Sequence, residues 1–330
     1  MSSEKTAMHN CLAIGFDRAL NYENSSIHGQ LTMCVFSINN LSSPSANNLS
    51  NFPVKEVVFD MIKLATMSSV SPDWTVAETV SAMKRYGYTG FEPRVEWGHA
   101  CQIETDLSTE QRSEVRDQFL GEGLEICCIA TGVRMATPNV AERDGHIEDL
   151  RRYIDLAADV GCRLVRTFGG QRDPDVEWPA VIDYVAEGYL RVVDQASDAG
   201  VIMLLETHDD WCSTAPVRSV IETVDHLSLQ VLWDFMHPQR MMETPEESFL
   251  AVGMLTRHTH VHDGCFVDGK LRVLDRLGDG EIDHAGPLEL LRLGRYNGYA
   301  SLEVIHSPGS DYDANAVLSQ HAEALRGLIE

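Results

Sequence analysis

Residues 181–206 read VIDYVAEGYLRVVDQASDAGVIMLLE and contain the unit that decides the fold. Apolar residues recur at helical spacing from Val181 to Ala199, which predicts an amphipathic helix. Gly200 follows, and glycine past a helix end adopts the left-handed conformation that satisfies the last helical carbonyls. The apolar run Val201–Glu206 then predicts a buried strand that ends in a carboxylate.

The same helix–glycine–strand unit recurs from Met61 to the C-terminus, with further glycines at Gly87, Gly123, Gly161 and Gly298. The predicted strands are Lys63–Met67, Gly90–Arg94, Glu125–Ala130, Arg163–Phe168, Val201–Glu206, Gln230–Asp234, His258–His262 and Ala300–Val304. Predicted helices include Val76–Arg85, Thr109–Glu122, Ile147–Val160, Val181–Ala199, Pro245–Val252 and Ala314–Ile329. Ser108 and Thr244 begin capping boxes that mark two of the helix starts.

Strands that alternate with helices are parallel, and eight of them predict a closed (β/α)₈ barrel. A doubly wound open sheet is the alternative, but no G-x-G-x-x-G follows any of the predicted strands. The chain of 330 residues is long enough for one such barrel, which typically needs about 250.

The first 60 residues differ from the rest, because Asn39–Asn51 is a polar, turn-rich run without periodicity. We expect residues 1–60 to form a flexible extension and residues 61–330 to form the barrel. Two alternatives are an arm that packs on the barrel or on a neighbouring subunit, and untranslated sequence upstream of a start at Met61.

Charge and cysteine content restrict the partners and the compartment. The net charge of −24 repels phosphate backbones and anionic membranes, so neither nucleic acid nor a membrane surface is expected as a partner. The 8 cysteines form no C-x-x-C pair, and neither an apolar run of membrane-spanning length nor a secretion signal is present. A cytoplasmic protein with reduced cysteines is the simplest interpretation.

Polar residues gather at the C-terminal ends of the predicted strands, which converge on one face of a barrel. Glu206, Asp234, His260 and Glu303 come from four consecutive strands. Three carboxylates in one pocket would repel one another, and a divalent cation would remove that cost. The oxygen-rich set with one imidazole favours Mn²⁺, with Mg²⁺ or Co²⁺ as alternatives.

Other polar residues at strand ends are candidates for binding the substrate, namely Arg94, Arg166, His208, His237 and Arg240. Salt bridges within an acidic protein are the alternative role for the arginines, and Glu92 could simply pair with Arg94. The three histidines of His258-x-His260-x-His262 point to one side of a strand, so at least one of them is not a ligand. The other histidines, His226, His284, His306 and His321, are interpreted as surface or loop residues.

The motifs LLETH, WDFMH, HTHVHD and SLEVI, in this order, resemble those of the sugar phosphate isomerases/epimerases, which are xylose isomerase-like barrels. The resemblance covers roughly residues 61–330. It implies that Glu206, Asp234, His260 and Glu303 bind one metal ion, that His237 contacts a substrate oxygen, and that Glu206 and Glu303 flank the reacting carbon. Dimers or tetramers are common among the proteins it resembles.

The resemblance implies a metal-dependent isomerase or epimerase of a keto-sugar or related polyol, which removes a proton next to a carbonyl and forms a metal-stabilised enediolate. The alternative on the same scaffold is a lyase, either a dehydratase of a keto-polyol or a glycoside-cleaving enzyme. A non-catalytic binding barrel is the third hypothesis. The chain departs from ketohexose 3-epimerases where Phe266 replaces an arginine, for which Arg272 could substitute, and from many relatives where His262 replaces a lysine.

Overall fold

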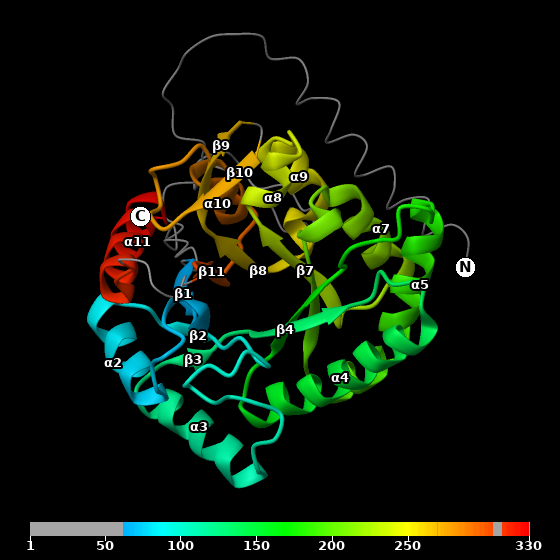
Figure 1. Ribbon diagram of the computed structural model, residues 1–330. Coiled ribbons are helices and arrows are strands. Elements are labelled where there is room, and N and C mark those ends of the chain that lie inside the picture. Colours follow the sequence, from blue (N-terminus) through cyan, green and yellow to red (C-terminus); the bar gives the residue numbers. More distant parts are fainter. Residues whose placement is uncertain (1–61, 269, 306–311, 330) are drawn as a thin grey trace, which may run out of the picture. The chain divides into compact units, whose positions relative to one another are not determined.

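The computed structural model of the chain describes residues 62–268, 270–305 and 312–329. The extension predicted for residues 1–60 lies outside them. The described residues form a ring of parallel strands with helices on the outside (Figure 1). The predicted barrel is therefore confirmed.

One sheet of nine strands forms the ring, in the order β3-β2-β1-β11-β8-β7-β6-β5-β4. Its strands are β1 (Lys63–Met67), β2 (Gly90–Glu92), β3 (Glu125–Ile126), β4 (Ile129–Arg134), β5 (Leu164–Phe168), β6 (Ile202–Glu206), β7 (Leu229–Asp234), β8 (Thr256–Val261) and β11 (Tyr299–Leu302). Each strand except β4 begins within about two residues of the first residue of a predicted strand. β4 is the second part of the strand that was predicted to begin at Glu125.

The ring closes at β3 and β4, which share one of the eight barrel positions. β3 pairs with β2 and β4 pairs with β5. An isolated parallel bridge between Arg94 and Ala130 joins the continuation of β2 to β4. The predicted single strand Glu125–Ala130 is therefore interrupted at Cys127 and Cys128, which are both buried.

The helices that connect the strands cover the outside of the barrel (Figure 1). They are α2 (Val76–Tyr86), α3 (Thr109–Gly121), α4 (Val140–Asp159), α5 (Trp178–Leu190), α6 (Val193–Asp198), α7 (Thr214–Val224), α8 (Met236–Arg240), α9 (Pro245–Val252), α10 (Ala285–Leu293) and α11 (Ala314–Ile329). Short 3₁₀ turns lie at Ser68–Val70, Asp209–Trp211 and Gly253–Leu255.

The predicted helix signals are confirmed at most positions. Both halves of the capping boxes at Ser108 and Thr244 are present, at the first turns of α3 and α9. The left-handed glycines that precede strands are Gly87, Gly123, Gly161 and Gly200, with φ of 78°, 73°, 75° and 68°. Gly298 does not have this conformation, because Arg295, with φ 61°, makes the left-handed turn after α10.

Two helix predictions were wrong in their bounds. α4 begins at Val140 rather than at Ile147, because the Asn139 side chain accepts hydrogen bonds from the backbone N–H groups of Ala141 and Glu142. The helix predicted from Val181 to Ala199 divides into α5 and α6. At the division, the carbonyl of Arg191 accepts a hydrogen bond from Arg151 Nη2 of α4.

A hairpin that was not predicted follows β8. Its strands, β9 (Asp263–Val267) and β10 (Lys270–Leu274), are antiparallel and separate from the barrel sheet. Phe266 and Arg272 lie on this hairpin and are exposed. No contact of Arg272 with a candidate site residue is present among the described residues.

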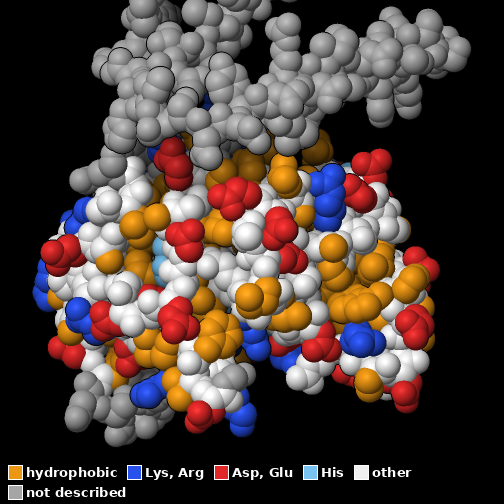
Figure 2. Space-filling view, turned by 90° about the horizontal axis from the view of Figure 1, so that it is seen from above, with side chains coloured by type: hydrophobic (Ala, Val, Ile, Leu, Met, Phe, Trp, Pro, Cys, Tyr) orange, Lys and Arg blue, Asp and Glu red, His pale blue; other side chains and the backbone are white. Residues whose placement is uncertain are grey.

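The buried apolar residues of the barrel form one main cluster and two small ones, of which one contains Ala65, Cys127 and Tyr299. The other small cluster, an inner one, contains Cys128, Leu204 and Leu232, and the main cluster fills the space between strands and helices. No described helix is long and apolar enough to cross a membrane. Acidic side chains are dispersed over the visible face among apolar ones, rather than gathered in one patch (Figure 2). The rigid barrel fixes the strand ends, where the polar residues lie.

Candidate metal centre

Four buried side chains from consecutive barrel strands meet at the C-terminal end of the barrel. Glu206 ends β6, Asp234 ends β7, His260 lies near the end of β8, and Glu303 directly follows β11. Each offers one ligand atom, and these atoms all lie within 4.8 Å of one another. The structure thus brings together the four residues that the sequence predicts as metal ligands.

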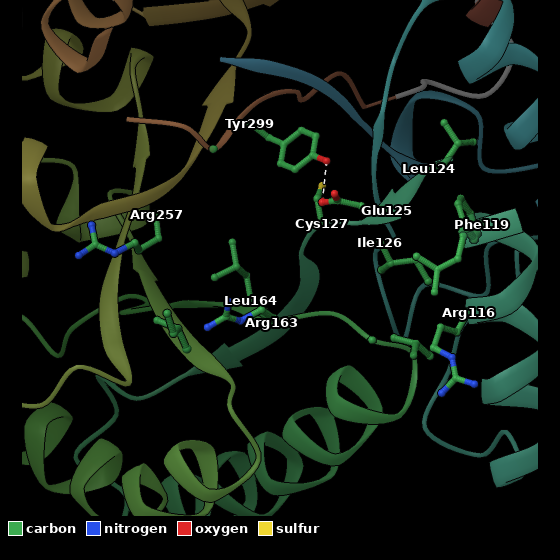
Figure 3. A pocket seen from close by; sticks show the side chains of 15 residues that line it. Arg116, Phe119, Leu124, Glu125, Ile126, Cys127, Arg163, Leu164, Arg257 and Tyr299 are labelled. Carbon is green, nitrogen blue, oxygen red and sulfur yellow. Dashed lines mark hydrogen bonds between the residues drawn. The ribbon is translucent and has the colours of Figure 1, made fainter. Parts of the chain in front are cut away.

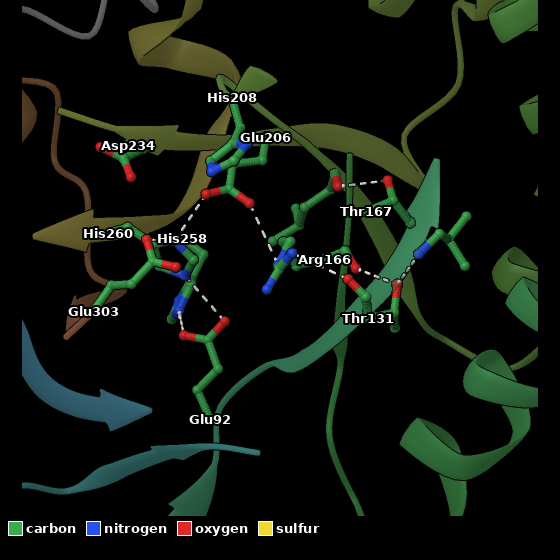
Figure 4. Close-up of polar contacts among 12 residues, drawn as sticks. Glu92, Thr131, Arg166, Thr167, Glu206, His208, Asp234, His258, His260 and Glu303 are labelled. Carbon is green, nitrogen blue, oxygen red and sulfur yellow. Dashed lines mark hydrogen bonds and ion pairs between the residues drawn. The ribbon is translucent and has the colours of Figure 1, made fainter. Parts of the chain in front are cut away.

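His260 lies at the centre of this group, which we call the four-residue cluster. Its Nδ1 atom is 3.0 Å from Glu206 Oε1 and 3.2 Å from Glu303 Oε2. In Figure 4, the side chains of Glu206 and Glu303 are turned toward this imidazole. The Nδ1 edge of His260 therefore faces the carboxylates of the cluster.

The charges of the cluster are costly without compensation. Two carboxylates about 4 Å apart repel each other by roughly 4 kcal/mol at an effective dielectric constant of 20. Burial raises the pKa of Glu303, but the neighbouring His260 outweighs it and the pKa lies well below the ordinary value. Burial lowers the pKa of His260, but Glu92, Glu303 and Glu206 together hold it well above the ordinary value.

The residues present fit a divalent cation. Glu206 Oε2 and Glu303 Oε2 are buried and lack a hydrogen-bond partner among the described residues. Three carboxylates and one imidazole form a donor set in which oxygen predominates, which suits Mn²⁺ or Mg²⁺ and also accommodates Zn²⁺. Within that part of the chain each has only ion-pair contacts, the shortest with Arg166 Nε at 3.3 Å and with His260 Nδ1 at 3.2 Å, and a cation would satisfy both oxygens.

Glu92 was not predicted to take part in the centre, yet its carboxylate lies directly behind His260. Glu92 Oε1 is 3.1 Å from His260 Nε2, and Glu92 Oε2 is 2.8 Å from His258 Nε2. Ser301 donates a hydrogen bond of 2.7 Å to the same Oε2. Glu92 therefore does not pair with Arg94, and it contacts the imidazole edge opposite the cluster (Figure 4).

A second group of histidines holds Asp234. His262 Nε2 is 2.8 Å and His237 Nε2 is 3.6 Å from Asp234 Oδ2, while Oδ1 accepts the backbone N–H of Met236. Burial lowers the pKa of His237 to about 4, so this imidazole is neutral at neutral pH. Burial also lowers the pKa of His262, but Asp234 outweighs it and raises the value to about 8.

The candidate substrate-binding residues differ in their surroundings. Arg166 is fully buried, lies 3.3 Å from Glu206 Oε2 through Nε, and donates from Nη1 to the Thr131 carbonyl. His208 pairs with Asp209 at 3.0 Å, and its ring lies 4.4 Å from that of His237. Arg240 is exposed, 3.5 Å from His237 Nδ1.

Three aromatic residues close to the strand ends also differ in their surroundings. Trp211 is fully buried and packs against Gly169, so it belongs to the core. Trp97 is 57% exposed beneath the guanidinium of Arg94. Phe168 stacks with the Arg166 guanidinium at 4.0 Å and lies 4.6 Å from the ring of His208. The rings of Phe168 and Trp97 therefore each contact an arginine guanidinium near the metal centre.

Two histidines interpreted as surface or loop residues are buried. His284 precedes α10 and contacts the carbonyl of His262 at 3.0 Å through Nε2. His321 lies within α11 and contacts the carbonyl of Asp275 at 2.9 Å. The interpretation was wrong for His321, because helix α11 turns this residue toward the barrel. His306 lies outside the described residues.

A cavity of about 620 Å³ lies at the other end of the barrel. It is lined by the beginnings of β3, β5, β6 and β11, with Arg116, Arg163 and Arg257 around an apolar floor (Figure 3). Since barrel enzymes carry out their chemistry at the C-terminal strand ends, this cavity is not the reaction site.

Solved structures share this architecture at low sequence identity. The IolI protein with a bound zinc atom superposes with a TM-score of 0.70 at 15% identity, over 81% of this chain and 98% of that one. The probable 3-DHS dehydratase AsbF from Bacillus anthracis gives 0.66 at 18% identity, over 80% and 99%. The 3-keto-D-glucoside 4-epimerase YcjR from E. coli gives 0.63 at 19% identity, over 80% and 98%.

These neighbours place dehydratase and epimerase chemistry on one scaffold, and at these identities they show the fold alone. A search of curated protein sequences returned no significant match. The sequence profile of one family matches residues 80–328, which is most of the barrel. The chain therefore belongs to the xylose isomerase-like TIM barrel family.

Proposed function

We propose that the chain is a divalent-metal-dependent isomerase or epimerase that removes a proton next to the carbonyl of a keto-sugar or related polyol. The observation that carries the proposal is the four-residue cluster, in which Glu206, Asp234, His260 and Glu303 bring ligand atoms within 4.8 Å of one another. Mn²⁺ is the proposed ion, because oxygen donors predominate.

The bound ion would supply Lewis-acid stabilisation of the negative charge that develops on the carbonyl oxygen during proton removal. His237 and His208 line the same strand ends. The neutral imidazole of His237 can donate to or accept from a substrate hydroxyl, since its pKa of about 4 keeps it uncharged. These two side chains would orient the hydroxyl groups beside the reacting carbon.

Glu206 and Glu303 are the proposed proton-transfer groups, and they are not equivalent. Glu206 is fully buried, and its Oε2 is already paired with Arg166 Nε at 3.3 Å. Glu303 is 7% exposed, and among the described residues its ion-pair contacts are with the imidazoles of His260 and His262. Glu303 is the better-placed base, and epimerisation would require a protonated Glu206 to donate its own proton on the opposite face, which leaves Glu303 protonated and Glu206 ionised.

The same asymmetry favours a second candidate function. A lyase that removes one proton and expels a β-hydroxyl or an aglycone needs a single base at the reacting carbon. The ion pair of Glu206 with Arg166, 3.3 Å long and fully buried, leaves Glu303 to act alone. A dehydratase or a glycoside-cleaving enzyme is therefore the alternative to the isomerase.

The test is proton NMR and mass spectrometry in D₂O with the Mn²⁺-loaded full chain. The panel contains keto-sugars, inososes, dehydroshikimate and 3-keto-glycosides. Deuterium gained next to the carbonyl with the skeleton intact supports the isomerase, and loss of water or of an aglycone supports the lyase. No exchange and no product with any compound contradicts both.

Glu303→Gln is the variant that tests the base assignment. It retains an oxygen donor but cannot accept the proton, so we expect exchange to fall by at least about 100-fold. Glu289→Gln removes a carboxylate that pairs with Arg292 on the exposed surface of α10, and it serves as the control. Full exchange in Glu303→Gln would remove this residue from the chemistry.

A further inference from the structure

Arg94 has a backbone that is fixed from several sides. It lies two residues beyond β2, where its N–H donates to Ser68 Oγ at 2.7 Å. Ser68 Oγ is also 2.8 Å from His99 Nδ1. The parallel bridge to Ala130 ties the same residue to the barrel rim. These contacts with the barrel therefore fix the backbone position of Arg94.

The guanidinium of Arg94 is supported on one face and lacks an acidic partner. Its Cζ atom lies 3.8 Å from the centre of the Trp97 ring. Its Nε is buried without a hydrogen bond, and no carboxylate lies within ion-pair distance of the side chain among the described residues. The Arg94 guanidinium is therefore held by an aromatic ring and leaves its Nε without an acceptor among the described residues.

The nearby carboxylates are engaged elsewhere. Glu206 contacts Arg166 and His260, and Glu92 contacts His258, His260 and Ser301. The charge of Arg94 nevertheless acts on this centre, since burial and Arg166 lower the pKa of Arg94 while Glu303 and Glu206 raise it. Arg94 is thus a cation at the barrel rim beside the metal centre, and no described residue accepts a hydrogen bond from its guanidinium.

We propose that Arg94 binds a carboxylate of the substrate, and that the substrate is a hydroxylated keto acid rather than a neutral sugar. This inference rests on the proposed function for the position of the reacting carbon. A planar guanidinium held on an aromatic ring matches one carboxylate through two parallel hydrogen bonds. A phosphate dianion is commonly bound by several donors. Arg94 would have to bind it without a second arginine, because the neighbouring Arg166 is already paired with Glu206.

The test compares ligands that differ only in the anionic group. D-Fructose, D-fructuronate and D-fructose 6-phosphate carry a hydroxyl, a carboxylate or a phosphate at one carbon. 3-Dehydroshikimate and its methyl ester form a cyclic pair. Isothermal titration of the full chain measures Kd for each, with and without Mn²⁺. We expect at least one carboxylate to bind about tenfold or more tightly than its neutral counterpart, because charge-assisted hydrogen bonds are strong.

Arg94→Gln is expected to abolish this preference while leaving Kd for the neutral ligand and for Mn²⁺ unchanged. Arg134→Gln is the matched control, because Arg134 is an exposed arginine at the end of β4, and it should keep the preference. Equal binding of neutral and carboxylate ligands, tighter binding of the phosphate, binding of none of the five compounds, or a preference that persists in Arg94→Gln overturns the inference.

The two proposals fail in different ways. A carboxylate preference that depends on Arg94 but appears without any Mn²⁺ binding supports the inference and contradicts the proposed function. Mn²⁺-dependent deuterium exchange on neutral keto-sugars, without a carboxylate preference, supports the proposed function and overturns the inference.

Discussion

Glu92 Oε1 lies 3.1 Å from His260 Nε2, on the side of the imidazole opposite the 3.0 Å contact between Nδ1 and Glu206. A carboxylate at Nε2 favours the tautomer that carries its proton there and leaves the Nδ1 lone pair free for a metal ion. Glu92→Gln should therefore weaken Mn²⁺ binding by about 10- to 100-fold, as is usual for carboxylates behind a histidine ligand. Isothermal titration calorimetry measures the change.

Ser301→Ala is the matched control for this prediction. It removes the 2.7 Å hydrogen bond to Glu92 Oε2 but leaves the contact of Oε1 with His260. Mn²⁺ affinity should change by less than about threefold, because the contact of Glu92 with the imidazole that binds the ion is retained. An equal loss in both variants would mean that Glu92 acts through general packing.

Binding of Mn²⁺ should release protons. The pKa of His260 is raised well above its ordinary value by Glu92, Glu303 and Glu206 against the effect of burial, so the cation-free protein holds a proton there at neutral pH. The ion needs a neutral imidazole, so affinity should rise with pH by about tenfold per unit for each proton released. The rise should weaken above the pKa of His262, which Asp234 raises to about 8 against burial.

Titration calorimetry in buffers with different ionisation enthalpies counts the released protons. Affinity that does not change between pH 6 and pH 8 would contradict the assignment of His260 as a ligand.

Asp263 is predicted to stabilise the loop that follows the hairpin. Its Oδ2 accepts the backbone N–H groups of Gly278 and Gly280 at 2.7 and 3.0 Å, and its Oδ1 accepts that of Gly264 at 2.8 Å. Asn retains only one acceptor oxygen, so Asp263→Asn should lower the free energy of unfolding by about 2–3 kcal/mol. Urea denaturation measures it.

Asp279→Asn removes a carboxylate from the exposed ion pair with Arg276 in the same loop and should change stability by less than about 0.5 kcal/mol. Equal stabilities of the two variants would show that the buried carboxylate of Asp263 does not hold the loop.

The barrel could be predicted from the sequence because its signals are local. Apolar runs, left-handed glycines such as Gly87 and Gly161, and the capping box at Thr244 each act within a few residues. The division between α5 and α6 could not be predicted, because Arg151 of a different helix binds the carbonyl at that position.

The candidate ligands could be predicted because parallel strand ends converge, which relates residues that are distant in sequence. Glu92 was missed for a different reason. A glutamate next to Arg94 looks like half of an ion pair, and only the closed barrel shows that it faces His258 and His260, 166 and 168 residues away. The signal that could have identified it is a fully buried acid within a strand.

The most direct test of the central claim is a titration of the full chain with Mn²⁺ that is monitored by electron paramagnetic resonance. The account predicts about one bound ion per chain for the wild type and for Asp279→Asn, and binding weakened beyond detection in Asp234→Ala and His260→Ala, because each removes a donor from a four-residue cluster. Undiminished binding in both ligand variants would contradict the metal centre.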